Sequence, residues 1–339
     1  MRHPTDRDNG MFTPREVYVV HAFPVFFAFR VEDRSYQVGA GGRSSGGHWN
    51  RIDERIYPVA SIAFDAPVNI ETALDRVWEW RRFFAQMAML PLPFEAISVQ
   101  GSLDDSAPSA NLYLPNLKRR AHKVTGFNGL SPHQLALNLW PDREHLGETM
   151  REWLSRDAVR RGFRVRLGRV IERMNRRLDP IDLVELGSAV DSLDELATGT
   201  SLPADVLNAI VDAAHTAATA AKTDIGRNRV SGLLGTLQRP SLATRFAALG
   251  ATLSPLIGEE GAALLARSAS KIRNASAHGG ALNDQIQPRL SSTVEALTAL
   301  CARFDLETCG VPCRSSSNAR TIAPRRFDEG LEQLRRLEA

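Results

Sequence analysis

Three polar side chains that could act on a phosphate lie within six residues of each other in the last third of the chain: Arg273, Asn274 and His278. An arginine holds a phosphate through a fixed fork of hydrogen-bond donors. A histidine has an unperturbed pKa of about 6.5 and exchanges protons near neutral pH. The amide of Asn274 can orient either group. These residue types suit cleavage of an RNA phosphodiester without a metal ion.

The spacing of these residues limits how they can meet. On one continuous helix, residues five apart point about 140° away from each other, so Arg273 and His278 lie on different faces. Asn274 and His278 are four apart and share a face. Convergence of Arg273 and His278 therefore requires a helix break near Gly279, or a second copy of the chain. The alternative interpretation is that both are surface residues whose positive charge complements the dipole of a helix end.

The motif belongs to a region, from about Arg151 onward, in which strand signals stop and helical periodicity dominates. Helix starts are expected at Pro203, Ser241, Glu259 and Pro288. Apolar residues at helical spacing predict buried stripes at Leu183, Leu186, Val190, Leu193 and Leu196, and at Leu290, Val294, Leu297, Leu300 and Phe304. The pattern predicts an all-α bundle of about five helices with short connections.

The stretch from Arg151 to Arg177 is predicted to be one amphipathic helix with a dense basic face. It holds ten arginines against three acidic residues, and its apolar stripe is Phe163, Leu167, Val170, Met174 and Leu178. One interpretation is a track for an RNA backbone, whose binding is salt-sensitive because neutralised phosphates release counterions. The residues assigned to RNA binding are Arg160, Arg161, Arg164, Arg169, Arg173 and Lys271. The other interpretation is packing against acidic neighbours, namely Asp182, Glu185, Asp191, Asp194 and Glu195.

The first half mixes strands with one clear helix. Segments rich in β-branched and aromatic residues predict strands within 17–31, 57–64, 94–99, 111–114 and 134–140. The stretch 39–47 is predicted to be a flexible loop, and a nucleophile-elbow pattern at 42–46 is interpreted as part of it because no helix follows. Asn69 is the expected N-cap of a helix that ends at Pro91. Its stripe, Leu74, Val77, Trp78, Arg81, Phe84, Met87 and Ala88, is expected to be core.

Composition and cysteine usage exclude several classes of protein. The net charge of +3 is too small to indicate a nucleic-acid partner by itself, so a basic footprint must be local. The three cysteines, Cys301, Cys309 and Cys313, are not a disulfide framework and fit a reducing cytosol. They also lack a second ligand pair, so neither a metal nor a cofactor is expected. Without an apolar run of about 20 residues or a signal-peptide core, a cytoplasmic protein that does not enter the membrane is expected.

The segment Arg273-Asn274-Ala275-Ser276-Ala277-His278 resembles the R-x(4–6)-H signature of the HEPN superfamily, including the polar residue directly after the arginine. The C-terminal half looks like the ApeA-like HEPN group of bacterial anti-phage systems. The segment from Phe64 to Val99 is similar to the N-terminal domain that accompanies it. The resemblance implies an α+β N-terminal domain over 1–145 that senses or selects substrate, and an all-α HEPN-type bundle over 150–308. From the sequence, residues 309–339 are expected to form a tail with a short amphipathic helix.

The resemblance also implies a metal-independent endoribonuclease that cleaves tRNA or another cellular RNA by 2′-hydroxyl attack. In that mechanism His278 transfers protons, Arg273 stabilises charge on the phosphate and Asn274 orients one of them. HEPN domains usually dimerise, so a homodimer or larger homo-oligomer is expected. The anti-phage group implies an abortive-infection toxin that responds to a phage-derived trigger. The alternative functions are a non-catalytic RNA-binding module and a protein-interaction scaffold.

Overall fold

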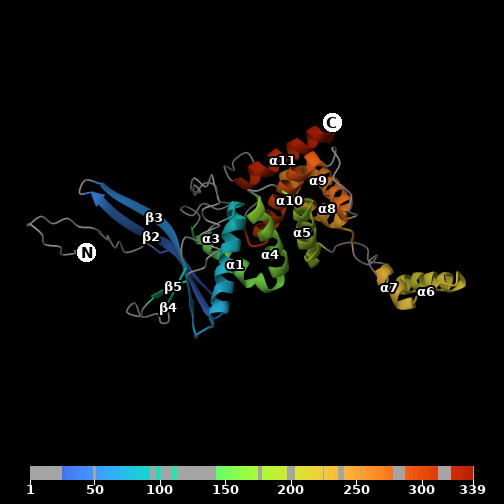
Figure 1. The fold of residues 1–339 in the computed structure, drawn as a ribbon, viewed down its shortest axis with the longest axis horizontal. Helices are drawn as coiled ribbons and strands as arrows, with labels where there is room; N and C mark the ends of the chain where they lie inside the picture. The colour runs from blue at the N-terminus through green and yellow to red at the C-terminus, as the bar shows by residue number, and fades with distance from the viewer. Residues whose placement is uncertain are drawn as a thin grey trace, which may run out of the picture. The chain divides into compact units, whose positions relative to one another are not determined.

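The structure is a computed structural model, and it describes residues 25–48, 51–91, 97–100, 109–112, 143–174, 178–196, 203–223, 225–235, 240–252, 254–277, 287–311 and 322–338. The described chain divides into two compact units. The first contains the described residues up to Arg156 except 84–91. The second contains 84–91 and the described residues from Asp157 onward. The coarse expectation of a mixed α and β part followed by a helical part is confirmed (Figure 1).

The first unit is built on a three-stranded antiparallel sheet in the order β1-β2-β3. The strands are β1 (Val25–Val31), β2 (Arg34–His48) and β3 (Arg51–Phe64). β1 pairs with β2 only as far as Val25 opposite Gly39, and β2 continues with β3 as a two-stranded ribbon up to His48 opposite Arg51. Figure 1 shows this ribbon in blue. A second, separate pair is β4 (Ile97–Gln100) with β5 (Ser109–Leu112).

The prediction of a loop at 39–47 is wrong, because this glycine- and serine-rich stretch lies inside β2. The hydrogen bonds between neighbouring strands join backbone N–H and C=O groups. A stretch without β-forming side chains can therefore be a strand if a neighbouring strand pairs with it. The partner is β3, which has the β-branched and aromatic residues that 39–47 lacks. The strand at 57–64 is confirmed as part of β3, and the strand expected at 134–140 lies outside the described residues.

One long helix, α1 (Ile70–Ala88), follows the sheet in sequence, and Asn69 caps it as expected. The Asn69 Oδ1 atom accepts a hydrogen bond of 2.8 Å from the Thr72 amide. The predicted buried stripe is partly wrong. Leu74, Val77, Trp78 and Phe84 are only half-buried, whereas Trp80 and Phe83 are buried.

The two buried aromatic residues of α1 have aromatic partners within the first unit. The ring of Trp80 lies 5.3 Å from that of Tyr36 on β2, and the ring of Phe83 lies 5.5 Å from that of Trp153. Trp153 belongs to α3 (Arg143–Ser155), which also packs on β1. These contacts are between elements distant in sequence, so periodicity within α1 alone does not identify the buried face.

The second unit is a helical bundle around one hydrophobic core. Its elements are α4 (Asp157–Arg173), α5 (Pro180–Asp191), the 3₁₀ turn η2 (Asp194–Leu196), α8 (Leu242–Thr252), α9 (Ser254–Ala277), α10 (Gln287–Glu307) and α11 (Ile322–Glu338). All three apolar stripes predicted for this region are buried. Gly258 has a φ of 66° that interrupts α9, so regular helix resumes at Glu259, where a start was expected.

The single helix predicted for 151–177 is instead two helices, α3 and α4, with a break at Arg156. The Ser155 hydroxyl donates to the carbonyl oxygen of Glu152 at 2.9 Å, and such a bond competes with continuation of the helix. The Arg156 Nε atom donates to the Glu152 carboxylate at 2.5 Å. Asp157 then begins α4 with a negative charge in its first turn, which the helix dipole favours.

The last helix of the chain, α11, packs along α10 and belongs to the second unit. The Ser292 hydroxyl of α10 donates to the Gln333 side-chain oxygen at 2.7 Å. A Cβ atom on Gly330 would lie 2.9 Å from the carbonyl oxygen of Ser292, so the glycine is what allows the two backbones to approach. None of the described helices is long and apolar enough to cross a membrane.

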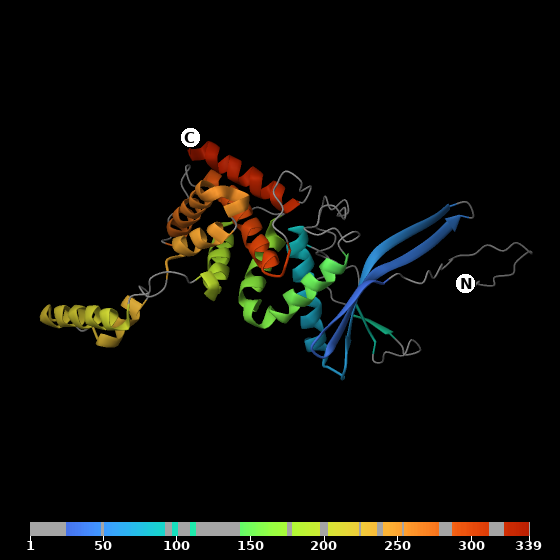
Figure 2. The ribbon, with the colours of Figure 1, turned by 180° about the vertical axis from the view of Figure 1, so that it is seen from behind.

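Two further helices, α6 (Ala204–Ala220) and α7 (Arg227–Leu234), pack against each other (Figure 2). Pro203 stands directly before α6, as expected. They share a separate small cluster of buried residues, Leu207, Val211 and Val230. The Arg227 guanidinium also pairs with the Asp212 carboxylate at 2.7 Å and so joins the two helices.

Candidate functional site

The motif singled out in the sequence lies in the last turns of α9, which ends at Ala277. Ile272 is buried in the bundle core, and this anchors the turn. Lys271, Arg273 and Asn274 are exposed on either side of it. His278, the predicted proton-transfer residue, lies outside the described residues.

The charge of this helix end is not compensated within the described part of the chain. No described carboxylate pairs with Lys271 or Arg273, and no described group forms a hydrogen bond with the Asn274 side chain. Lys271 and Asn274 are three residues apart and share a face, whereas Arg273 points about 100° away from Asn274. The turn therefore presents two cations and an amide over a broad exposed surface, which suits contact with an anion such as a phosphate.

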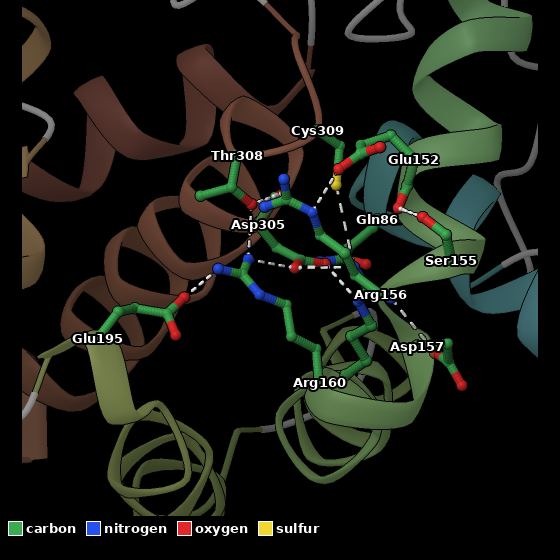
Figure 3. A network of polar contacts seen from close by, with 11 residues as sticks. Gln86, Glu152, Ser155, Arg156, Asp157, Arg160, Glu195, Asp305, Thr308 and Cys309 are labelled. Atoms are coloured by element: carbon green, nitrogen blue, oxygen red, sulfur yellow. Dashed lines mark hydrogen bonds and ion pairs between the residues drawn. The ribbon is translucent and has the colours of Figure 1, made fainter.

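The basic helix behaves differently, because two of its arginines point into the core. The Arg160 and Arg164 side chains are 7% and 0% exposed. The Arg164 Nε and Nη2 atoms donate to the two carboxylate oxygens of Asp305 at 2.9 and 3.2 Å. The Arg160 Nη1 atom donates to the same carboxylate at 2.8 Å (Figure 3). The structure therefore corrects their expected role, since neither guanidinium is available to an RNA backbone.

Asp305, on α10, is the centre of this buried polar network. Gln86 also donates to it, at 3.0 Å, and Arg160 extends the network to Thr308 at 2.6 Å and to the Glu195 carboxylate. Burial by itself raises the pKa of Asp305, but the charges and hydrogen bonds of Arg164 and Arg160 outweigh burial and lower it. The two guanidinium groups and the Asp305 carboxylate thus form one charge-paired cluster, as buried ionised groups require.

Three further arginines of α4, which are exposed or half-buried, also have acidic partners. Arg166 and Arg169 each lie 3.5 Å from the Glu185 carboxylate, and Arg173 pairs with Asp182 at 2.8 Å. Arg161 is exposed and takes part in contacts of its own. The alternative expectation, packing of the basic helix against acidic neighbours, therefore holds for Asp182, Glu185 and Glu195. Much of the positive charge of this helix is compensated inside the protein.

One signal in the sequence could have identified the buried arginines. Asp305 follows Cys301 by four residues and Phe304 by one, and both of these belong to the apolar pattern of their helix. A carboxylate on a buried face requires a cationic partner. Arginines that share the face of Phe163 and Leu167 were the available candidates, but sequence alone does not tell which helix supplies them.

In the ranges that the structure describes, no three histidine, cysteine, aspartate or glutamate residues are grouped so as to hold a metal ion. Comparisons with protein families, with curated proteins and with solved structures find no match to this chain. Its function must therefore be argued from its own residues.

Proposed function

We propose that the chain is a metal-independent endoribonuclease of the HEPN type, with its active site at the end of α9. The observation that supports it is the contrast between two sets of cations. Lys271 and Arg273 are exposed without a described acidic partner, whereas five arginines of α4 are paired with carboxylates. A phosphate meets a strong attraction only where the cation is not already neutralised.

In the proposed reaction the ribose 2′-hydroxyl gives its proton to a base and attacks the adjacent phosphorus. The bond from phosphorus to the 5′-oxygen breaks, and that oxygen takes a proton from an acid. The products are a 2′,3′-cyclic phosphate and a 5′-hydroxyl, and no metal or external reactant is required. His278 transfers the protons, and Arg273 stabilises the charge that develops on the phosphate. Asn274 orients the histidine or the phosphate.

Dimerisation is part of this proposal. On a continuous helix Arg273 and His278 would point about 140° apart, so their convergence on one phosphate requires either a helix break near Gly279 or a second copy of the motif, and the proposal takes the second copy. Two copies of the bundle, each bringing one motif, give an acid, a base and two guanidinium groups. The biological role that goes with it is an anti-phage toxin in the cytoplasm that cleaves tRNA or another cellular RNA.

The test is RNA cleavage by the purified full-length protein in the presence of a chelator. We expect His278→Ala to lower the rate about 10²–10⁴-fold, and Arg273→Ala to lower it about 10²–10³-fold. Arg336→Ala is the matched control, because Arg336 is an exposed helical arginine on α11, and it should cleave at the wild-type rate. Equal cleavage by all four proteins would refute the proposal. RNA that is retained but recovered intact would instead favour a non-catalytic RNA-binding module.

A further inference from the structure

The surface of helix α6 divides into three sectors. The first faces α7 and contains Leu207 and Val211, which with Val230 form the buried cluster. The second is polar and contains Asp205, Asn208, Asp212, Thr216 and Thr219, all exposed.

The third sector is apolar, yet the described residues leave most of it exposed. It consists of Val206, Ala209, Ile210, Ala213, Ala217 and Ala220. At 100° per residue these six positions fall within an arc of about 100°, next to the sector that faces α7. Val206 is 40% exposed, the four alanines are exposed, and Ile210 is half-buried.

The pair α6–α7 is poorly stabilised by its own contacts. Helices in proteins gain most of their stability from packing of an apolar face. Here α7 has eight residues and covers only one of the two apolar sectors of α6, and the shared cluster contains three buried residues. A helix of 17 residues with a second apolar sector is therefore suited to a further partner.

We propose that this second sector is an interface between two copies of the chain, in which the two α6 helices pair antiparallel. The larger side chains, Val206 and Ile210, lie in the first half of the sector, and alanines occupy the second half. Antiparallel pairing places Val206 opposite Ala217 and Ile210 opposite Ala213, so each of the two large residues meets a small one. Parallel pairing places large against large and small against small, which packs poorly.

Charge gives a second and independent reason for this arrangement. Asp205, in the first turn of α6, and Lys222, just after its last turn, are both exposed and have no ion-pair partner among the described residues. Antiparallel pairing brings the Asp205 end of one helix to the Lys222 end of the other, and it also aligns the helix dipoles favourably. Parallel pairing brings like charges together. The interface goes beyond the proposed ribonuclease activity and does not depend on it.

The direct test is a pair of cysteines in the full-length protein, Val206→Cys with Ala217→Cys. Within one chain these positions are eleven residues apart, about 16 Å along the helix, which is too far for a disulfide. In the antiparallel pair they face each other across the interface. The double variant should form a covalent dimer under mild oxidation, and each single variant and the wild type should not. Absence of the dimer in the double variant, or a dimer in either single variant, would overturn the proposal.

A second test uses substitution on two sectors of the same helix. Ala213→Glu places a charge in the interface, and Asn208→Glu places the same residue on the polar sector, with little effect on helix propensity in either case. In the Val206→Cys and Ala217→Cys background, Ala213→Glu should lower the yield of covalent dimer at least tenfold and Asn208→Glu should leave it unchanged, with unchanged far-UV circular dichroism for both; this yield is the measure of association through α6. Asp205→Lys and Lys222→Asp should each weaken association, and the two together should restore it. Equal association of the two glutamate variants would contradict the interface.

Discussion

Arg164 of α4 and Asp305 of α10 form a fully buried ion pair, joined by two hydrogen bonds, between residues 141 positions apart in the sequence. Arg160 and Gln86 donate to the same carboxylate. The pair fixes α10 against α4, and it explains why a helix that is rich in arginine belongs to the core of the bundle. Arginines that are buried against Asp305 stabilise the fold, whereas a substrate can reach only cations that stay exposed.

The first prediction concerns the stability that this pair provides. Asp305→Ala leaves two buried guanidinium groups without their carboxylate, so it should lower the free energy of unfolding by about 3–5 kcal/mol. Urea denaturation followed by circular dichroism measures this change. Glu332→Ala is the control, since the partners of Glu332 among the described residues are the exposed Arg335 and Arg336, and it should cost about 1 kcal/mol or less. Equal effects of the two substitutions would show that the buried pair is not important for stability.

The second prediction concerns the dependence of stability on pH. Since the pKa of Asp305 is lower in the folded protein than in the unfolded chain, its contribution is fully present above the unfolded value of about 3.9. That contribution is lost as the pH falls from there through the folded value. Urea midpoints should therefore decrease below about pH 4 more steeply in the wild type than in Asp305→Asn, which cannot titrate. Parallel pH profiles of the two proteins would contradict the conclusion that titration of Asp305 contributes to the loss of stability in acid.

The third prediction concerns the cysteines. Cys301 and Cys309 are buried, and burial raises the pKa of both thiols, that of Cys309 to about 11. Because the thiolate is the reactive form, neither should be alkylated appreciably at pH 8 while the protein is folded. Both should react promptly in urea. Mass spectrometry of iodoacetamide-treated protein assigns the modified residues, and rapid modification of Cys301 in the native state would show that α10 is not packed as described.

The fourth prediction separates the two groups of cations by their effect on RNA binding, measured with His278→Ala protein so that RNA stays intact. The logarithm of the affinity for single-stranded RNA falls linearly with the logarithm of the salt concentration. Lys271→Ala and Arg273→Ala should each make this slope shallower by about 0.7. Arg169→Ala should change it less, because Arg169 already pairs with Glu185. A larger effect from Arg169 than from Arg273 would move the RNA surface to α4.

Local patterns in the sequence predicted much of the helical unit. The residues Phe163, Leu167 and Val170 of α4 and the stripe from Leu290 to Phe304 of α10 are buried, and the Asn69 cap of α1 forms as expected, because each pattern belongs to a single helix and its cap. The break at Arg156 was missed, since the competing bond of Ser155 is a matter of side-chain geometry. These successes and errors concern single helices.

What the sequence did not predict depends on contacts between distant segments. The inward orientation of Arg160 and Arg164 follows from Asp305, which belongs to another helix. The glycine-rich half of β2 is a strand because β3 pairs with it. In the candidate site, the exposure of Lys271, Arg273 and Asn274 agrees with the expected helix-end motif, but the meeting of Arg273 with His278 stays a prediction.

The most direct test of the proposed activity is the chemistry of the RNA ends after incubation with the protein in chelator. A ribonuclease that works through Arg273 and His278 should leave 2′,3′-cyclic phosphate and 5′-hydroxyl ends at defined positions, and these ends should disappear in both Arg273→Ala and His278→Ala. Intact RNA with the wild-type protein, or the same ends from both variants, would contradict the active site proposed at the end of α9.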